Sequence, residues 1–174
     1  VRDNLEVDFE GTLRKVKELG FDGVEFAGLY GRDPEAVKSL IEEIGLTPIS
    51  AHVSIDELLD DTEGVLEAYK KIGCKYAAIP YIVEDRRPGA ERWEKTVEDI
   101  KKIATVAKSK GIQLMYHNHD FEFMKINGKF ALDELYKVLG SLPTKSVTLF
   151  LDACFSGAKR EGDMMASARG VAIR

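Results

Sequence analysis

The chain has 174 residues, of which 44% are hydrophobic and 32% charged, and its formal net charge at pH 7 is -5. These values are typical of one globular domain with a sizeable core, and they exclude a disordered or fibrous chain. The acidic balance argues against broad electrostatic binding of nucleic acid or of an anionic membrane. No apolar run approaches the roughly 20 residues of a membrane span, and the first residues have no signal-peptide character, so we expect a cytoplasmic protein. The two cysteines, Cys74 and Cys154, lack the spacing of a metal site, so we expect reduced thiols.

A helix followed by a strand repeats along the chain. In each copy a helical apolar period ends at a glycine, and a short run rich in β-branched or aromatic residues follows. The clearest copy has Asp33 as a favourable N-cap, Pro34 at the first helical position and Gly45 at the end. The five predicted pairs of helix and strand span residues 8–20 and 23–28, 33–45 and 48–53, 62–73 and 76–81, 91–111 and 112–119, and 132–140 and 147–152.

The predicted helix over 91–111 is amphipathic, so it covers a sheet on one side only. Its apolar face carries Trp93, Val97, Ile100, Ala104 and Ala107, and its polar face carries Glu94, Lys95, Asp99 and Lys102.

The predicted strands are largely apolar on both faces, as in residues 76–79, which is typical of parallel strands covered by helices. One segment differs, because the alternation of Phe121 and Phe123 and the pair Asn127-Gly128 predict a small β-hairpin between residues 121 and 130.

Alternating helices and strands leave two α/β architectures, a (β/α) barrel or a doubly wound open sheet, and the pattern alone does not separate them. Neither the Gly-x-Gly-x-x-Gly signature of dinucleotide-binding sheets nor the Gly-Lys-Ser/Thr signature of phosphate-loop enzymes is present, which favours the barrel. A full barrel needs about 250 residues and eight strands. We therefore predict a partial (β/α) TIM barrel with parallel strands.

Polar residues end several of the predicted strands, where both architectures place their ligand sites. They are Glu25, His52, Tyr81, the run over 117–122 and Asp152, and they include all three histidines of the chain. Histidine and carboxylate groups from several strand ends suit a divalent cation such as Mn²⁺, Zn²⁺ or Mg²⁺, which would polarise a carbonyl while a neighbouring Glu or His moves a proton. Taken singly, each of these residues could equally be a buried, hydrogen-bonded structural group.

Segments over residues 8–13, 23–31, 50–54 and 79–81, together with Tyr-His-Asn-His-Asp-Phe-Glu-Phe over 116–123, resemble the sugar phosphate isomerase/epimerase family, the xylose-isomerase-like TIM barrels. The resemblance covers residues 1 to about 140. It implies a metal-dependent isomerase or epimerase that acts on a sugar or sugar phosphate through an enediolate. In that family the metal is usually held by Glu, Asp, His and Glu from four successive late strands, and the resemblance places His117 at the first position and Asp152 at the second.

The resemblance also implies that the family's first strand and its last strands are missing from this chain. We therefore expect weak or no activity from the chain by itself, and a homodimer that pairs the open sheet edges. With these roles in view, we assign Glu25, His52 and Glu122 to catalysis, His117, His119 and Asp152 to the metal, and Tyr81 and Asn118 to substrate binding.

The end of the chain resembles a second family. Residues 147–157, with Asp-Ala-Cys-Phe-Ser-Gly, and residues 168–173 are similar to the caspase-like cysteine peptidases of the metacaspase group, which implies Cys154 as a nucleophile. A thiol nucleophile needs a base, which this family supplies as a His usually followed by Gly, and none of the three histidines precedes a glycine. We therefore predict a partial barrel over 1–145 and a strand plus caspase-like tail over 146–174. A peptidase using Cys154 and a non-catalytic scaffold remain the alternatives.

Overall fold

The computed structural model describes residues 1–140. They belong to two compact units, of which the first spans Val1–His117 and the second begins at Asn118. The strand predicted over 147–152 and the caspase-like tail lie outside the described residues. No helix in the described part is both long enough and apolar enough to cross a bilayer.

The first unit is built on a four-stranded parallel sheet whose strand order follows the sequence. Its strands are β1 (Gly23–Phe26), β2 (Thr47–His52), β3 (Tyr76–Ile79) and β4 (Gln113–Tyr116). Its long helices are α2 (Phe9–Glu18), α3 (Pro34–Ile44), α5 (Thr62–Ile72) and α6 (Trp93–Lys110).

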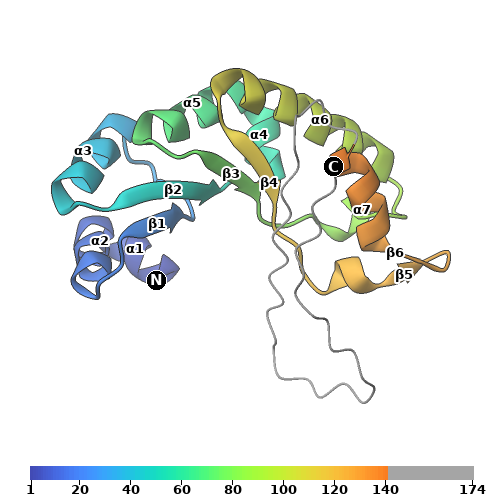
Figure 1. Ribbon diagram of the computed structural model, residues 1–174, viewed down its shortest axis with the longest axis horizontal. Coiled ribbons are helices and arrows are strands. Elements are labelled where there is room, and N and C mark those ends of the chain that lie inside the picture. Colours follow the sequence, from blue (N-terminus) through green and yellow to red (C-terminus); the bar gives the residue numbers. More distant parts are fainter. Residues whose placement is uncertain (141–174) are drawn as a thin grey trace, which may run out of the picture. The chain divides into compact units, whose positions relative to one another are not determined.

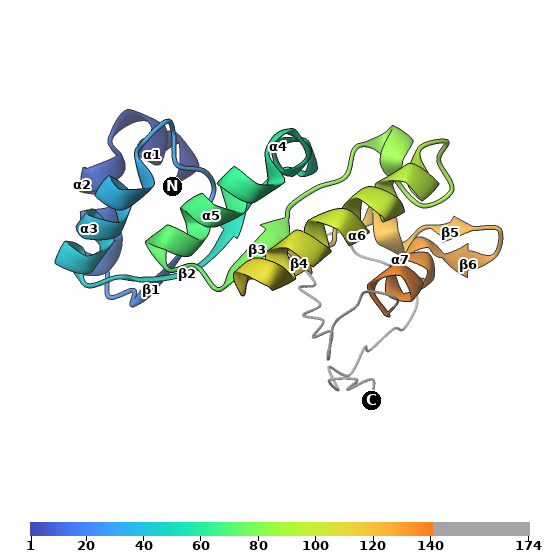
Figure 2. The same ribbon diagram turned by 90° about the horizontal axis from the view of Figure 1, so that it is seen from above.

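The long helices form one row, because α2 packs on α3, α3 on α5 and α5 on α6. Figure 1 shows α3, α5 and α6 along one face of the sheet, and Figure 2 shows the same row from above. Crossovers between parallel strands are nearly always right-handed, so a strand order that never reverses puts every helix on the same face. A doubly wound sheet reverses its order part-way and carries helices on both faces. The prediction of a partial (β/α) barrel is therefore confirmed.

Local chemistry sets the helix ends where the sequence predicts them. Asp33 caps α3 by accepting hydrogen bonds from the backbone N–H groups of Glu35 and Ala36. The helix then ends at Gly45, whose φ of 75° is the left-handed conformation that glycine adopts without strain. Helices α5 and α6 end in the same way at Gly73 and Gly111.

One hydrophobic core joins the helix row to the sheet. It contains Phe26, Ala51, Ala77 and Ile79 from the strands, and Leu13, Ile41, Leu66 and Ile103 from the helices. Strands of a parallel sheet can bury such apolar side chains because helices cover them.

The polar face of α6 is narrower than the sequence predicts. Ile100, Ala104 and Ala107 are buried as expected, but Asp99 is only 7% exposed, so the prediction that it faces away is wrong. The reason is that α6 packs against α5, β4 and α4 together, so more of its circumference is covered. Lys95, one turn earlier, donates a hydrogen bond to the Asp99 carboxylate and compensates its charge.

Three short elements of the first unit were not predicted. They are α1 (Arg2–Val7), α4 (Ile55–Asp60) and a 3₁₀ turn, η1 (Glu84–Arg86). Each is too short to show a helical period. For α4 the local signal is its cap, because the Ser54 hydroxyl accepts a hydrogen bond from the N–H of Glu57.

The described part of the second unit contains a 3₁₀ turn, a hairpin and a helix. They are η2 (Phe121–Phe123), β5 (Lys125–Ile126), β6 (Lys129–Phe130) and α7 (Ala131–Gly140). The hairpin is confirmed, and its turn is formed by Asn127 and Gly128 with φ angles of 52° and 82°. Phe121 and Phe123 do not alternate along a strand as expected, since both lie in η2, which leaves Glu122 between them buried.

The packing of the core predicts how much stability the first unit loses when a buried side chain is shortened. Leu66 is fully buried on α5, so Leu66→Ala should lower the free energy of unfolding by about 2–5 kcal/mol. Leu59→Ala is the matched control, because Leu59 is 37% exposed and its loss should cost much less. Urea denaturation followed by circular dichroism measures both variants, and equal losses would contradict the packing described.

Candidate active site

Three polar side chains share one face of the sheet at the ends of β1 and β2. Glu25 pairs with Ser50 across the two strands, and directly paired residues of a parallel sheet point to the same side. His52 lies two residues after Ser50, so it points to that side as well. The sheet therefore gathers a carboxylate, a hydroxyl and an imidazole next to one another.

An irregularity in the pairing of β1 and β2 produces this arrangement. Val24 pairs with Pro48, but Glu25 pairs with Ser50, so Ile49 is skipped. Pro48 has no N–H to donate to the sheet, and proline in a strand is commonly found beside such an irregularity. Regular pairing would place Glu25 beside Ile49, whereas the shift places it beside Ser50.

Both oxygens of the Glu25 carboxylate are engaged. Oε1 lies 3.0 Å from Nε2 of His52, and Oε2 accepts a hydrogen bond from the Ser50 hydroxyl. The hydrogen bond from His52 holds the pKa of Glu25 below its ordinary value of 4.5, burial opposes this shift, and the hydrogen bond from Ser50 adds to it. The carboxylate is therefore held in its ionised form beside an imidazole.

His117 joins this group from the end of β4. Its backbone N–H donates a hydrogen bond to the backbone carbonyl of Ile79 at 3.0 Å. Its ring centroid lies 5.2 Å from that of His52 at an interplanar angle of 73°. Strand β3 runs between the two histidines, and Ala78 is its residue paired with His52. Because Ala78 presents only a methyl group, the two rings can approach each other across β3. The first unit thus brings together Glu25, His52 and His117, three of the predicted site residues.

Tyr81 follows β3 and is 46% exposed, in keeping with a residue at the rim of a site. Its hydroxyl accepts a hydrogen bond from Nη2 of Arg87. The Arg87 guanidinium also lies 5.2 Å from the centre of the Tyr81 ring, and its Nε donates to the carbonyl of Ile82 at 2.9 Å. These contacts hold the ring beside a positive charge.

Three other predicted site residues belong to the second unit. Asn118 and His119 are half-buried, whereas Glu122 is 1% exposed. The Glu122 carboxylate accepts a hydrogen bond of 2.6 Å from the backbone N–H of His119. The His119 ring stacks on Phe121 with centroids 5.4 Å apart. A charge-assisted bond of this kind stabilises a buried carboxylate and orders the backbone around it.

The predicted metal ligands are only partly described. Asp152 lies outside the described residues, and His117 and His119 belong to different units. Cys154, the alternative nucleophile, also lies outside the described residues. Among residues 1–140, no three or more His, Cys, Asp or Glu side chains are grouped so that they could hold a metal ion. The set of His117, His119 and Asp152 therefore stays a prediction.

Two residues near Glu25 were not predicted from the sequence. Ser50 is 4% exposed and bonds the carboxylate; its signal is its place two residues before His52 on the same strand. Cys74 is also 4% exposed, and burial, assisted by the charge of Glu25, raises the pKa of its thiol to about 12. Cys74 is therefore a protonated, packed side chain under ordinary conditions.

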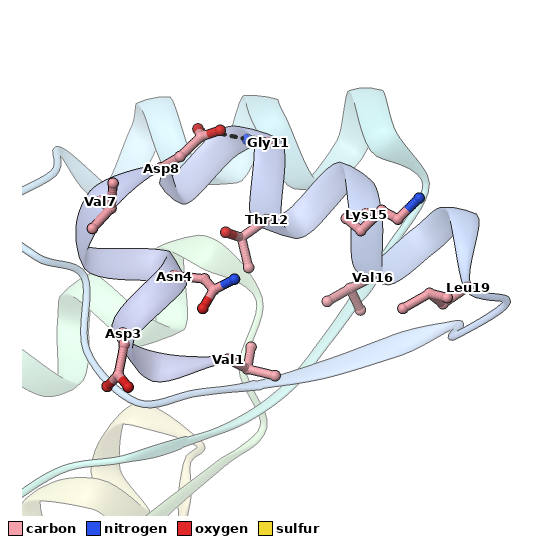
Figure 3. Close-up of a pocket in the computed structure, with 10 residues that line it drawn as sticks. All are labelled: Val1, Asp3, Asn4, Val7, Asp8, Gly11, Thr12, Lys15, Val16 and Leu19. Atoms are coloured by element: carbon pink, nitrogen blue, oxygen red, sulfur yellow. Dashed lines mark hydrogen bonds between the residues drawn. The ribbon is translucent and has the colours of Figure 1, made fainter.

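A cavity of about 750 Å³ lies elsewhere in the first unit, along α1 and α2 (Figure 3). Val7, Thr12 and Lys15 are among the residues that line it, and no histidine does. The Asp8 carboxylate in its wall is used to cap α2, since it accepts a hydrogen bond from the N–H of Gly11. Because this cavity holds no paired acid and base, we place the candidate active site at the strand ends.

The family model of xylose isomerase-like TIM barrels matches residues 13–172. The chain belongs to this family. The predicted resemblance to the xylose-isomerase-like TIM barrels is therefore confirmed. The match continues through the segment over 146–172, and the comparisons do not support the resemblance of that segment to caspase-like peptidases.

Curated relatives include two inosose dehydratases. That of Erwinia tasmaniensis is 26% identical over 133 residues, covering 66% of this chain and 45% of the relative. That of Geobacillus thermodenitrificans is 23% identical over 175 residues, covering 87% of this chain and 57% of the relative. The chain thus spans about half the length of the curated relatives it matches.

Solved structures with the same fold include a sugar phosphate isomerase/epimerase from Parabacteroides distasonis. Its TM-score is 0.64 at 22% identity, and the match covers 79% of this chain and 61% of that one. A second neighbour is the IOLI protein with a bound zinc atom, with a TM-score of 0.55 at 14% identity over 75% of this chain and 52% of that one. These likenesses show a shared fold.

The contacts of Glu25 predict how stability depends on pH. The lowered pKa means that the ionised carboxylate stabilises the folded state above pH 4.5, and that this contribution is lost as the pH falls below that value. The advantage of the wild type over Glu25→Gln should therefore be larger at pH 7 than at pH 3.5. The difference should stay below about 1 kcal/mol, because the side chain is 43% exposed.

Glu57→Gln provides the control for this measurement. Burial raises the pKa of Glu57, so its ionisation opposes folding and the difference should change with pH in the opposite direction. Urea unfolding at both pH values measures the two variants. The same trend in both would show that the Glu25 contacts do not act as described.

Proposed function

We propose that this chain supplies the acid–base groups of a site that removes a proton from the carbon next to the carbonyl of a sugar or sugar phosphate. The observation that carries the proposal is the 3.0 Å contact between the Glu25 carboxylate and Nε2 of His52. This contact lies at the carboxyl ends of the parallel strands, where barrels of this kind place their active sites. His117 lies beside it.

The proposed step leaves the substrate as an enediolate. A base takes the proton, the electron pair of the broken C–H bond forms a carbon–carbon double bond, and the carbonyl oxygen takes up the negative charge. An isomerisation is completed when the hydroxyl on the original carbon passes its proton to the former carbonyl oxygen and a proton returns to the former carbonyl carbon. Return of the proton to the opposite face of the original carbon, with re-formation of the original carbonyl, completes an epimerisation. We propose one of these two outcomes.

Dehydration is the second candidate, and the inosose dehydratases among the relatives favour it. It would begin with the same proton removal and would continue with loss of hydroxide from the next carbon. The two candidates therefore require the same acid–base pair and differ in the product formed.

We assign proton transfer to His52, with Glu25 as the carboxylate that orients it, because an imidazole can both accept and donate a proton and Glu25 lies 3.0 Å from its Nε2. Glu122 is the third proposed catalytic group. Tyr81 and Asn118 are proposed to contact the substrate, and the Arg87 guanidinium on the Tyr81 ring supports a rim that attracts oxygen-rich ligands.

We also propose a divalent cation, Mn²⁺, Zn²⁺ or Mg²⁺, as the cofactor. The proposed ligands His117, His119 and Asp152 are two imidazoles and a carboxylate, a donor set that suits such ions, and the zinc bound by the IOLI protein supports the assignment. When bound, the cation would polarise the substrate carbonyl. The proton transfer is assigned to the chain's own residues.

We propose a small sugar or sugar phosphate as the partner of the chain, and we propose that it binds neither nucleic acid nor a membrane. The proposed location is the cytoplasm. A homodimer also stays a proposal. It is supported by the described sheet, in which β1 and β4 each have a single neighbour, since unpaired strand edges favour pairing with another chain.

Exchange of hydrogen with solvent tests the proton transfer. In D₂O the protein should incorporate deuterium, at the low rate expected of this chain by itself, next to the carbonyl of at least one member of a panel of ketoses, ketose phosphates and inososes. The exchange accumulates over a long incubation and is followed by ¹H NMR. Glu25→Gln and His52→Asn should each lower the rate about 10²-fold or more, whereas Lys17→Gln, a change on the surface of α2, should leave it unaltered. Absence of exchange for the whole panel, or full rates in both site variants, would overturn the proposal.

Equilibrium dialysis tests the cofactor. The wild type should bind Mn²⁺ or Zn²⁺, and His119→Ala and Asp152→Ala should each weaken binding at least about tenfold because each removes one donor. His52→Asn should bind as the wild type does, since His52 is not a proposed ligand. Unchanged binding in both ligand variants would remove this metal site.

A further inference from the structure

We propose that Ser50 is a positioning residue that orients the Glu25 carboxylate toward Nε2–H of His52 and thereby leaves Nδ1 of His52 as the atom that exchanges protons with the substrate. This inference rests on the proposed function and names the atom that performs its first step.

The direction of the first hydrogen bond follows from the chemistry of the two groups. An ionised carboxylate can only accept hydrogen bonds, so the Ser50 hydroxyl must donate to Oε2 of Glu25. Ser50 is 4% exposed, and a buried hydroxyl that lost this acceptor would lose its compensation for desolvation. The bond therefore holds the carboxylate from one side.

The second hydrogen bond determines the tautomer of His52. Oε1 of the same carboxylate lies 3.0 Å from Nε2, and because this oxygen only accepts, Nε2 must carry the hydrogen. A neutral imidazole has one N–H, so its lone pair then resides on Nδ1. With Oε2 fixed by Ser50, rotation of the carboxylate away from His52 would break both bonds.

The neighbours of these residues favour a single arrangement. The pairing of Glu25 with Ser50 places the carboxylate on β1 directly beside β2, the strand that carries His52, and the ring of His117 packs edge-on against the His52 ring. The imidazole is thus contacted by a carboxylate and by a second ring. In serine hydrolases, where a carboxylate orients the catalytic imidazole in the same manner, loss of the correct tautomer lowers kcat about 10⁴-fold.

The tautomer can be measured without any substrate. Long-range ¹H–¹⁵N NMR at pH 8, where an ordinary imidazole is neutral, should show His52 as the Nε2–H tautomer in the wild type. Ser50→Ala should shift the two ring nitrogens toward a mixture of tautomers, and Ser50→Thr, which retains a hydroxyl, should restore the wild-type spectrum. Ser39→Ala, at an exposed serine of α3, is the matched control and should change nothing.

The rate of deuterium exchange gives the second readout. Ser50→Ala should lower kcat about tenfold with KM unchanged, because the hydroxyl orients the base without contacting the substrate. Circular dichroism and thermal unfolding verify that each variant is folded. A His52 that carries its hydrogen on Nδ1, or a Ser50→Ala protein with the wild-type tautomer, would overturn the assignment. The expected tautomer change in a protein that exchanges no substrate hydrogen would support the role of Ser50 and count against the proposed function alone.

Discussion

The structure of the first unit depends on one constraint, which is that each parallel strand pairs with the strand that precedes it in the sequence. Since crossovers are right-handed, this order sends every connecting helix to the same face of the sheet. That face can then be apolar, as Phe26, Ala51 and Ala77 are. The connecting helices do not pack on the opposite face, so that face can carry the polar side chains Glu25 and His52 at the strand ends.

A second, local constraint decides which side chains meet on that face. The skipped residue in the pairing of β1 and β2 sets Glu25 beside Ser50, and a carboxylate held at both oxygens follows from this register. The small Ala78 on β3 then lets His52 and His117 approach across an intervening strand. The candidate site is therefore a product of backbone register and side-chain volume together.

Much of the fold could be predicted because its signals are local. The cap at Asp33, the helix stop at Gly45 and the turn at Asn127-Gly128 act through their own backbone, so they hold in any surroundings. The burial of Asp99 could not be predicted, since it depends on which elements pack around α6. The same applies to Ser50, which is an unremarkable strand residue until the pairing with β1 gives it a carboxylate partner.

The sequence by itself determined the order of helices and strands, the family, and the candidates Glu25, His52 and His117, because apolar periods, helix-ending glycines and polar strand ends are all visible along the chain. The sequence also predicted the partial barrel, which the strand order confirmed. Only the tertiary structure placed the Glu25 carboxylate between a hydroxyl and an imidazole. That outcome depends on which strands become neighbours and in what register. Such contacts join residues about 25 positions apart, and no local propensity specifies them.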